Sequence, residues 1–354
     1  MNKNDLIHIL ATPDRLELER IRGAAEETLL RCCGNKVYFR GLIEFSNLCD
    51  NDCLYCGIRK SNRRVARYVL TKEKIIEAAL WCGEQGYGSV VLQSGERCDE
   101  KFIGFVEEIV AAIKDKSRTP AMPEGLGITL SVGEQSEATY RRFFAAGAHR
   151  YLLRIETTSP ELYKRLHPAN MRLPDRIESL NALRRAGFQV GTGVMIGLPG
   201  QTVEQLADDL LFFRDIDIDM IGMGPYIMHH DTPLSAWRDV HERTAADRFD
   251  LALRMIAAAR LLLEDVNIAA ATALQAIDPE GREKALSWGA NIIMPQLTPT
   301  EVRHDYQLYD GKPCLDESAD QCRSCLQIRI AGAGREIGYD SWGDSKHAIN
   351  KRQP

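Results

Sequence analysis

Short apolar runs rich in β-branched residues alternate along the chain with longer amphipathic stretches. The short runs, typical of buried strands, span residues 37–47, 89–95, 127–133, 150–157, 189–197, 220–227, 268–274 and 291–298. Helical periodicity predicts helices at 71–85, 136–146, 175–186, 203–215 and 245–263, and Thr71 and Thr202 are suitable N-caps for two of them. Eight strand-helix repeats with right-handed crossovers fit a closed barrel better than an open sheet. The pattern therefore predicts an α/β fold with a complete (βα)8 TIM-type barrel.

The chain has 354 residues, a length that admits one large barrel with additions at its ends. We expect a cap of N-terminal helices over residues 1–36, the barrel over 37–300 and a cysteine-bearing C-terminal extension over 301–354. The last residues, HAINKRQP, form a basic tail that we expect to fray.

Composition narrows the class of function. A net charge of -5 gives no basic field that would attract nucleic acid, so a small-molecule substrate is favoured. No apolar stretch has the length of a membrane span, and the first residues mix acids and bases where a signal peptide needs an apolar run. We therefore expect a cytoplasmic protein. Six of its ten cysteines fall into two tight groups, which indicates metal ligation rather than disulfides.

The first group, Cys49, Cys53 and Cys56, directly follows the first predicted strand, so it should lie at the carboxyl rim of the barrel. A structural zinc site needs four closed ligands, and the motif offers no fourth. Three thiolates can hold a 4Fe-4S cluster with one iron left open. The spacing C-x3-C-x2-C, with Tyr55 before the third cysteine, resembles the radical S-adenosylmethionine (SAM) superfamily, in which SAM binds that iron. A barrel suits such chemistry because it excludes competing reactions.

Other polar residues near predicted strand ends are candidates for binding SAM. Gln93 and Ser94 begin a QSGE turn where the superfamily commonly has a GGE-like turn for the methionine amino group, although a plain surface turn is the alternative. Arg154 and Glu156 share one face of the fourth strand. We expect Glu156 to bond the ribose and Arg154 or Arg176 to meet the SAM carboxylate, unless the charged pair only neutralises itself.

Polar side chains also recur on single faces of strands, where ordinary barrels carry aliphatic layers. If these faces point inward, they enclose a cavity for a polar or anionic substrate; otherwise they satisfy one another in a closed core. The residues concerned are Arg40, Glu44 and Ser46 on strand one, Thr129 and Ser131 on strand three, and Thr272 on strand seven.

The second group of cysteines, Cys314, Cys322 and Cys325, has the spacing C-x7-C-x2-C and lies in the extension. Three ligands suggest a second, peripheral Fe-S cluster, either 4Fe-4S or 2Fe-2S. Zinc with a fourth ligand from elsewhere, or no metal at all, are the alternatives.

The sequence resembles the HydE family of FeFe-hydrogenase maturases, which are radical SAM enzymes. The resemblance is carried by EFSNLCDNDCLYCGIRKSN, VLQSGE, TLSVGE, RYLLRIET, VMIGLPGQT, IGMGPYI, HDTPL, NIIMP and the YQLY segment before the second cysteines. It implies a monomeric barrel, a SAM-binding 4Fe-4S cluster, an optional second cluster and a role in assembling the diiron subcluster of the H-cluster. It also implies a small precursor that contains sulfur or iron, and we expect a reductant such as ferredoxin or flavodoxin and contact with other hydrogenase maturases.

Site residues carry over by position. The resemblance assigns SAM contacts to Tyr55, Gln93, Ser94, Arg154, Glu156, Arg176, Met195 and Tyr306, and an anion-accepting inner cavity to Arg40, Thr129 and Thr272. Ala271 stands where a second threonine is expected, and Gly200 where a looser superfamily pattern has Glu.

Two other functions fit parts of the sequence. A methylornithine synthase of pyrrolysine biosynthesis would share the barrel and the first motif, but the second cysteine group argues against it. A non-catalytic Fe-S scaffold or carrier would use both cysteine groups without cleaving SAM.

Overall fold

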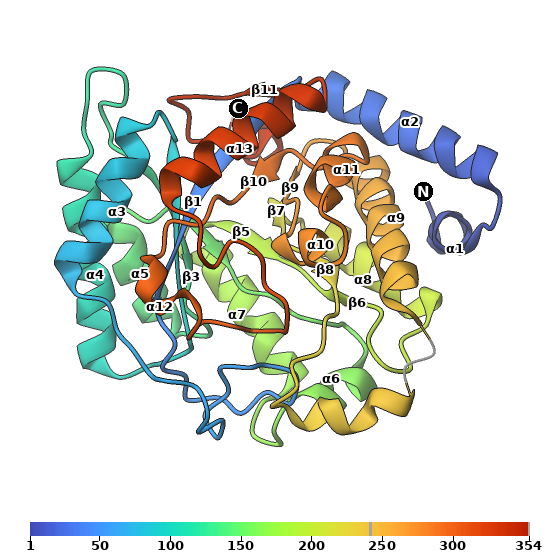
Figure 1. The fold of residues 1–354 in the computed structure, drawn as a ribbon, viewed down its shortest axis with the longest axis horizontal. Helices are drawn as coiled ribbons and strands as arrows, with labels where there is room; N and C mark the ends of the chain where they lie inside the picture. Colours follow the sequence, from blue (N-terminus) through green and yellow to red (C-terminus); the bar gives the residue numbers. More distant parts are fainter. Residues whose placement is uncertain (241–242, 353–354) are drawn as a thin grey trace.

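The structure, a computed structural model, describes residues 1–240 and 243–352. Eight parallel strands form a ring in the order β10-β1-β2-β3-β4-β5-β7-β9. Ala269, directly after β9, pairs with Ile292 of β10 and closes the ring, which confirms the predicted barrel (Figure 1). The strands are β1 (Lys36–Ser46), β2 (Ser89–Ser94), β3 (Gly127–Ser131), β4 (Arg150–Leu152), β5 (Gln189–Thr192), β7 (Met220–Ile221), β9 (Asn267–Ile268) and β10 (Ile292–Ile293). A parallel pair of short strands, β6 (Met195–Ile196) and β8 (Gly224–Pro225), continues β5 and β7 toward the carboxyl rim.

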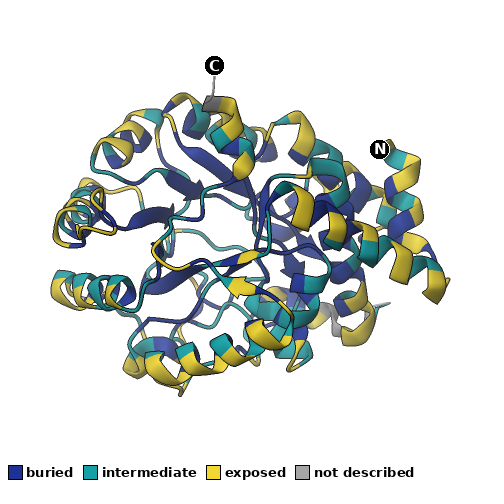
Figure 2. Ribbon diagram, turned by 90° about the horizontal axis from the view of Figure 1, so that it is seen from above, coloured by how far each residue is buried: buried dark blue, intermediate teal, exposed yellow. Residues whose placement is uncertain are grey.

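Helices surround the strands and bury one face each, as Figure 2 shows by the dark centre and the exposed outer surfaces. The helices between strands are α3 (Lys72–Glu84), α4 (Glu100–Lys116), α5 (Glu137–Ala145), α6 (Pro160–Leu166), α7 (Leu173–Arg185), α8 (Val203–Asp215), α9 (Ala245–Leu263), α10 (Thr272–Ile277) and α11 (Gly281–Ser287). The five predicted helices are present. Thr71 and Thr202 cap α3 and α8 through their side chains, and each such cap contributes about 1 kcal/mol.

The ends of the chain pack outside the ring. Two helices that precede β1, α1 (Lys3–Ala11) and α2 (Arg15–Cys32), contact α8 and α9. After β10 come α12 (Thr300–Arg303), α13 (Ala319–Gly332), β11 (Glu336–Ile337), which pairs with β1, and α14 (Lys346–Arg352). A 3-10 helix, η1 (Pro233–Val240), follows β8. In Figure 1, α13 and β11 lie at the opposite end of the barrel from α6.

The C-terminal tail is expected to fray, but its described part, up to residue 352, instead closes the amino end of the barrel, and residues 353–354 lie outside the described residues. Arg150 donates to the carboxylate of Asp344 and, at 2.9 Å, to the carbonyl of Trp342. His347 of α14 lies 2.9 Å from Asp265 and 2.7 Å from Asp217. Because Arg150 is fully buried, its charge needs these partners, which fixes the tail.

Thr272, predicted on the seventh strand, begins helix α10 instead. The inner strand ends after two residues, and the amide of Ala270 donates to Ile292 at 2.9 Å before the chain turns. The following Ala-rich segment, 269–276, has a high helix propensity, which outweighs the apolar pattern typical of a strand.

Among the described helices, none combines the length and the apolar composition that a membrane span requires.

Candidate active site

The loop that carries the first cysteines follows β1 and is tied to its surroundings by backbone hydrogen bonds. The amide of Asp50 donates to Glu96 at 2.8 Å, and the amide of Leu54 donates to Leu166 at the same distance. A Cβ on Gly95 would lie 2.3 Å from the carbonyl oxygen of Leu48, so the QSGE turn approaches the loop closely only because it has glycine there. The loop is therefore held at the carboxyl rim, as predicted.

Cys49, Cys53 and Cys56 are partly exposed free thiols in this loop. Burial, and for Cys53 and Cys56 also the neighbouring thiols, raises the pKa of each, to about 12 for Cys56. The three Sγ atoms do not all lie within 4.8 Å of one another, the spacing expected of side chains that share one metal ion. A cluster of several irons tolerates wider spacing and stabilises thiolates, so the set fits a three-cysteine Fe-S cluster better than single-ion zinc.

A cavity of about 100 Å³ opens beside Cys56 and is lined by four more of the predicted residues: Tyr55, Arg154, Glu156 and Met195. Arg154 lies 2.9 Å from Glu156. The backbone of Glu156 is in the left-handed region, with φ 66°, and its carbonyl accepts from the amide of Met195 at 3.1 Å. A strained, non-glycine residue at a cavity is typical of functional sites.

The segment that follows Glu156 is tied to α8 by hydrogen bonds. Thr158 donates its amide, at 2.7 Å, and its hydroxyl, at 2.6 Å, to the carboxylate of Asp209. Burial raises the pKa of Asp209 to about 7, partly offset by the hydrogen bonds from Thr158. Sequence reasoning missed Asp209 because nothing in the amphipathic pattern of α8 marks an inward carboxylate.

The other predicted SAM contacts lie near the same rim but do not line this cavity. Arg176 approaches Glu134 at 2.5 Å and Glu96 at 4.0 Å, so it neutralises two acids of the rim. Gln93 donates to the hydroxyl of Tyr306 at 3.3 Å. Ser94 is buried and donates to its neighbour's carbonyl at 2.8 Å.

Sequence reasoning also missed an internal ion pair that fixes the segment 306–312. Lys312 approaches both carboxylate oxygens of Glu44, at 2.5 and 2.7 Å, and donates to the carbonyl of Tyr306 at 3.0 Å. Glu44 therefore belongs to a closed polar cluster with Lys312 and Gln296 rather than to an open cavity. The same segment places Tyr309 against the rim cavity.

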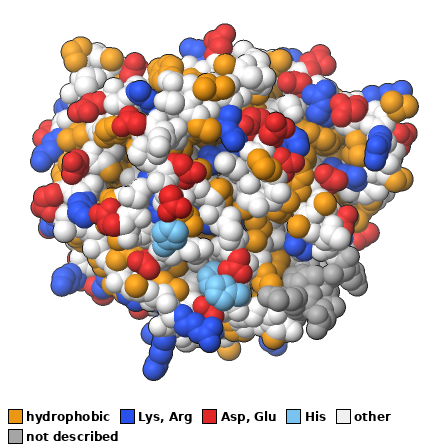
Figure 3. Space-filling view, in the orientation of Figure 1, with side chains coloured by type: hydrophobic (Ala, Val, Ile, Leu, Met, Phe, Trp, Pro, Cys, Tyr) orange, Lys and Arg blue, Asp and Glu red, His pale blue; other side chains and the backbone are white. Residues whose placement is uncertain are grey.

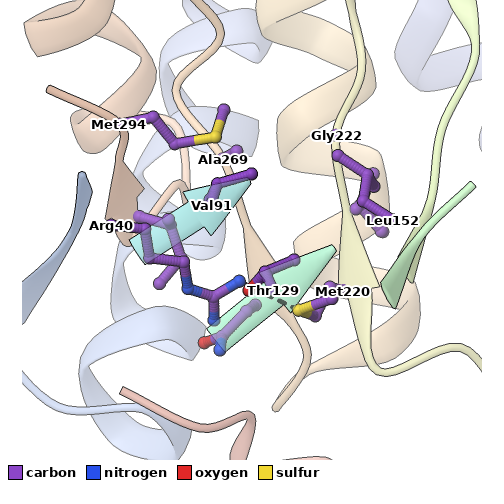
Figure 4. A pocket seen from close by; sticks show the side chains of 11 residues that line it. Arg40, Val91, Thr129, Leu152, Met220, Gly222, Ala269 and Met294 are labelled. Atoms are coloured by element: carbon purple, nitrogen blue, oxygen red, sulfur yellow. Dashed lines mark hydrogen bonds between the residues drawn. The ribbon is translucent and has the colours of Figure 1, made fainter. Parts of the chain in front are cut away.

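Deeper in the barrel, a cavity of about 30 Å³ is lined by Arg40, Thr129, Met220 and Met294 among others (Figure 4). Arg40 is buried and donates to Met220 Sδ at 2.9 Å and to the carbonyl of Gly343 at 3.0 Å. Burial and the nearby Arg150 lower the pKa of Arg40. Ser131 and Thr272 do not line this cavity.

The second cysteine group is only partly gathered. Cys322 is buried in α13 and Cys325 is exposed one turn later. Arg282 donates to the sulfur of Cys314 at 3.5 Å. The hydrogen bond with Cys322 lowers the pKa of Cys314, and Arg282 adds to this effect.

Known proteins resemble this chain over nearly its whole length. The model of the radical SAM superfamily matches residues 43–213. The FeFe hydrogenase maturase subunit HydE of Thermotoga maritima is 42% identical over 341 residues, which are 96% of this chain and 92% of that protein. The chain belongs to the HydE family.

More distant relatives share the architecture of this HydE-family member. The 3-methylornithine synthase of Methanosarcina barkeri is 28% identical over 88% of this chain and 83% of its own. A crystal structure of methylornithine synthase aligns with a TM-score of 0.78 at 25% identity, covering 96% of this chain and 94% of that one. The structure of the maturase HydG has the same TM-score at 17% identity, over 96% and 72% of the two chains, and supports the fold alone.

Membership of the HydE family makes this chain a radical SAM enzyme. It also implies a 4Fe-4S cluster and SAM as cofactors, which agrees with the three thiols and the rim cavity described above.

Proposed function

We propose that the chain matures FeFe hydrogenase by cleaving SAM and acting on a small anionic precursor that contains iron or sulfur, held inside the barrel. The similarity to the HydE of T. maritima supports the pathway. The observation that carries the substrate class is Arg40. It is buried in the barrel, its Nε has no partner among the described residues, and no described carboxylate forms an ion pair with it.

A buried guanidinium that no carboxylate contacts directly is costly, since Asp344 acts on Arg40 only from a distance, and an anionic ligand would offset that cost. Thr129 lines the same cavity and offers a hydroxyl, while the thioethers of Met220 and Met294 offer soft, polarisable contacts for sulfur or iron. Ser131, the last residue of β3, and Thr272, the first residue of α10, would also contact the precursor, an assignment that rests on their predicted roles and not on this cavity.

Around the rim, Cys49, Cys53 and Cys56 would hold the 4Fe-4S cluster. When bound and reduced, the cluster with SAM supplies a 5'-deoxyadenosyl radical. Both residues line the rim cavity, where Glu156 would accept hydrogen bonds from ribose hydroxyls and Arg154 would meet the SAM carboxylate with its planar fork. Tyr55 and Met195 form an apolar wall that excludes water from the same cavity.

The remaining predicted SAM contacts support this site from nearby. Gln93 and Tyr306 form one hydrogen-bonded unit, Ser94 begins the turn against the cysteine loop, and Arg176 balances Glu96 and Glu134. We further propose that Cys314, Cys322 and Cys325 bind a second, peripheral Fe-S cluster. An acidic electron carrier of the ferredoxin or flavodoxin class would supply electrons, and other hydrogenase maturases would supply or receive the small molecule.

Substitution of Arg40 tests the substrate class. Reconstituted Arg40→Gln should still form 5'-deoxyadenosine slowly with dithionite and SAM alone, but an iron-cysteine-carbonyl precursor should no longer stimulate that rate. Arg20→Gln, on the exposed face of α2, is the matched control and should respond to the precursor like the wild type. Full stimulation in Arg40→Gln would refute the role of Arg40, and formation of methylornithine would favour the synthase activity over the proposed one.

A further inference from the structure

Three metal-ligating side chains meet at the carboxyl rim outside the proposed cluster and SAM contacts. His229 and His230 follow β8, and Asp310 lies between α12 and α13. One ligand atom from each lies within 4.8 Å of the other two. Within 1–240 and 243–352, no other three His, Cys, Asp or Glu side chains bring their ligand atoms this close together. In Figure 3, histidine atoms on this face of the molecule lie beside acidic ones.

The two segments are locked together before any ion binds. His230 Nδ1 lies 2.7 Å from Asp310 Oδ1, and the amide of His230 donates to Asp310 Oδ2 at 3.0 Å. The amide of Asp310 donates in turn to the carbonyl of Met228 at 3.1 Å. The ligands therefore come from two chain segments about eighty positions apart that are already held in register.

His229 occupies the buried side of the group. Its side chain stacks on His230 with ring centroids 4.8 Å apart, and its Nδ1 accepts from the amide of Asp231 at 3.1 Å. A Cβ on Gly57, the residue after Cys56, would lie 2.6 Å from His229 Nε2, so the group adjoins the cysteine loop. The carboxylate of Asp231, which also pairs with Arg64, lies 3.2 Å from His230 Nε2 and can orient that ring.

We propose that His229, His230 and Asp310 bind one divalent first-row transition-metal ion, such as Fe²⁺ or Zn²⁺. Two imidazoles and one carboxylate are a donor set that such ions prefer, and they leave coordination positions open. The ion binds His229 Nδ1, whose lone pair now accepts from the amide of Asp231, and His230 Nδ1, which now faces Asp310. Because the donors are nitrogen and oxygen, this site is chemically distinct from both cysteine groups.

Zinc is a suitable probe because it is redox-silent and distinguishable from cluster iron. The reconstituted enzyme, with its iron and sulfide content measured, would be titrated with Zn²⁺, and bound zinc would be counted by elemental analysis after gel filtration. X-ray absorption at the zinc edge then identifies the ligands. We expect one zinc per chain with nitrogen and oxygen neighbours at about 2.0–2.2 Å.

Three variants decide the assignment. Asp310→Asn and the more exposed His230→Gln should each weaken zinc binding about tenfold or more at unchanged cluster iron. His304→Gln removes a comparable surface pair, His304 with Asp316 at 2.9 Å, and should leave zinc binding unchanged. Zinc bound only to sulfur, no zinc bound at all, or equal affinity in His230→Gln and the wild type would each overturn the proposal and leave the group as an ion-pair link between two loops.

Discussion

Replacement of Lys312 by methionine tests whether the internal ion pair with Glu44 holds the segment 306–312 in place. The side chains of Glu44 and Lys312 are only 2% and 7% exposed, so water cannot solvate a carboxylate that loses its partner. Lys312→Met leaves the carboxylate of Glu44 with a single hydrogen bond, from Gln296 at 2.8 Å. Breaking one side of a buried pair costs about 3–5 kcal/mol, a large part of the stability of an ordinary domain.

The double variant Glu44→Gln/Lys312→Met removes both charges and separates that cost from mere loss of packing. The glutamine introduced at position 44 still accepts from Gln296, so we expect the double variant to recover at least about half of the lost free energy of unfolding. Lys74→Met breaks an exposed pair with Glu301, whose two side chains are 49% and 54% exposed, and should cost less than about 0.5 kcal/mol.

The assay is urea unfolding of the cluster-free, reduced chains, followed by far-UV circular dichroism under anaerobic conditions. Because Lys312 also bonds the carbonyl of Tyr306, binding of SAM to the reconstituted Lys312→Met enzyme should weaken as well. A loss below about 1 kcal/mol in Lys312→Met, or equal losses in the single and double variants, would refute the reasoning.

Two further predictions follow from single buried groups. The pKa of Asp209 is about 7 in the folded chain and near 4 when unfolded, so between these pH values the folded chain keeps a proton that the unfolded chain releases. The free energy of unfolding should therefore fall as pH rises from about 4 to about 7, by at most about 4 kcal/mol. Asp209→Asn should abolish most of that slope in thermal unfolding measured at several pH values, and an unchanged slope would contradict the assignment. Gly57→Ala would place a Cβ 2.1 Å from the carbonyl oxygen of Gln307, so we expect much less iron per chain after reconstitution. As a control, Gly104→Ala has no atom within 4 Å of its Cβ and should bind the normal amount of iron. Equal iron in the two variants would show that the loop after Cys56 adapts.

The parts of the fold that sequence predicted are those with strong local patterns. β1, β2 and β3 are long apolar runs, and α3 and α8 carry capping threonines, so propensity and burial agree. The run 150–157 has the pattern of one strand, but only Arg150–Leu152 is regular, and farther along the run Glu156 adopts the left-handed conformation. A functional cavity interrupts the regular pattern there.

The features that sequence did not predict are long-range polar contacts. The tail is fixed by Asp344 against Arg150, nearly two hundred positions away, and Glu44 meets Lys312 across 268 positions. Neither partner carries a local pattern that names the other. The cysteine loop, by contrast, could be placed because its ligands are close in sequence and follow a strong strand.

We propose that this chain cleaves SAM with a cluster held by Cys49, Cys53 and Cys56. The yield of 5'-deoxyadenosine from anaerobically reconstituted protein given dithionite and SAM tests this activity. We expect product from the wild type, none from Cys53→Ala, and nearly wild-type product from Cys322→Ala with less iron per chain. No product from fully loaded wild-type protein would contradict the claim and indicate a scaffold, and equal losses in the two variants would contradict the peripheral place of the second cysteine group.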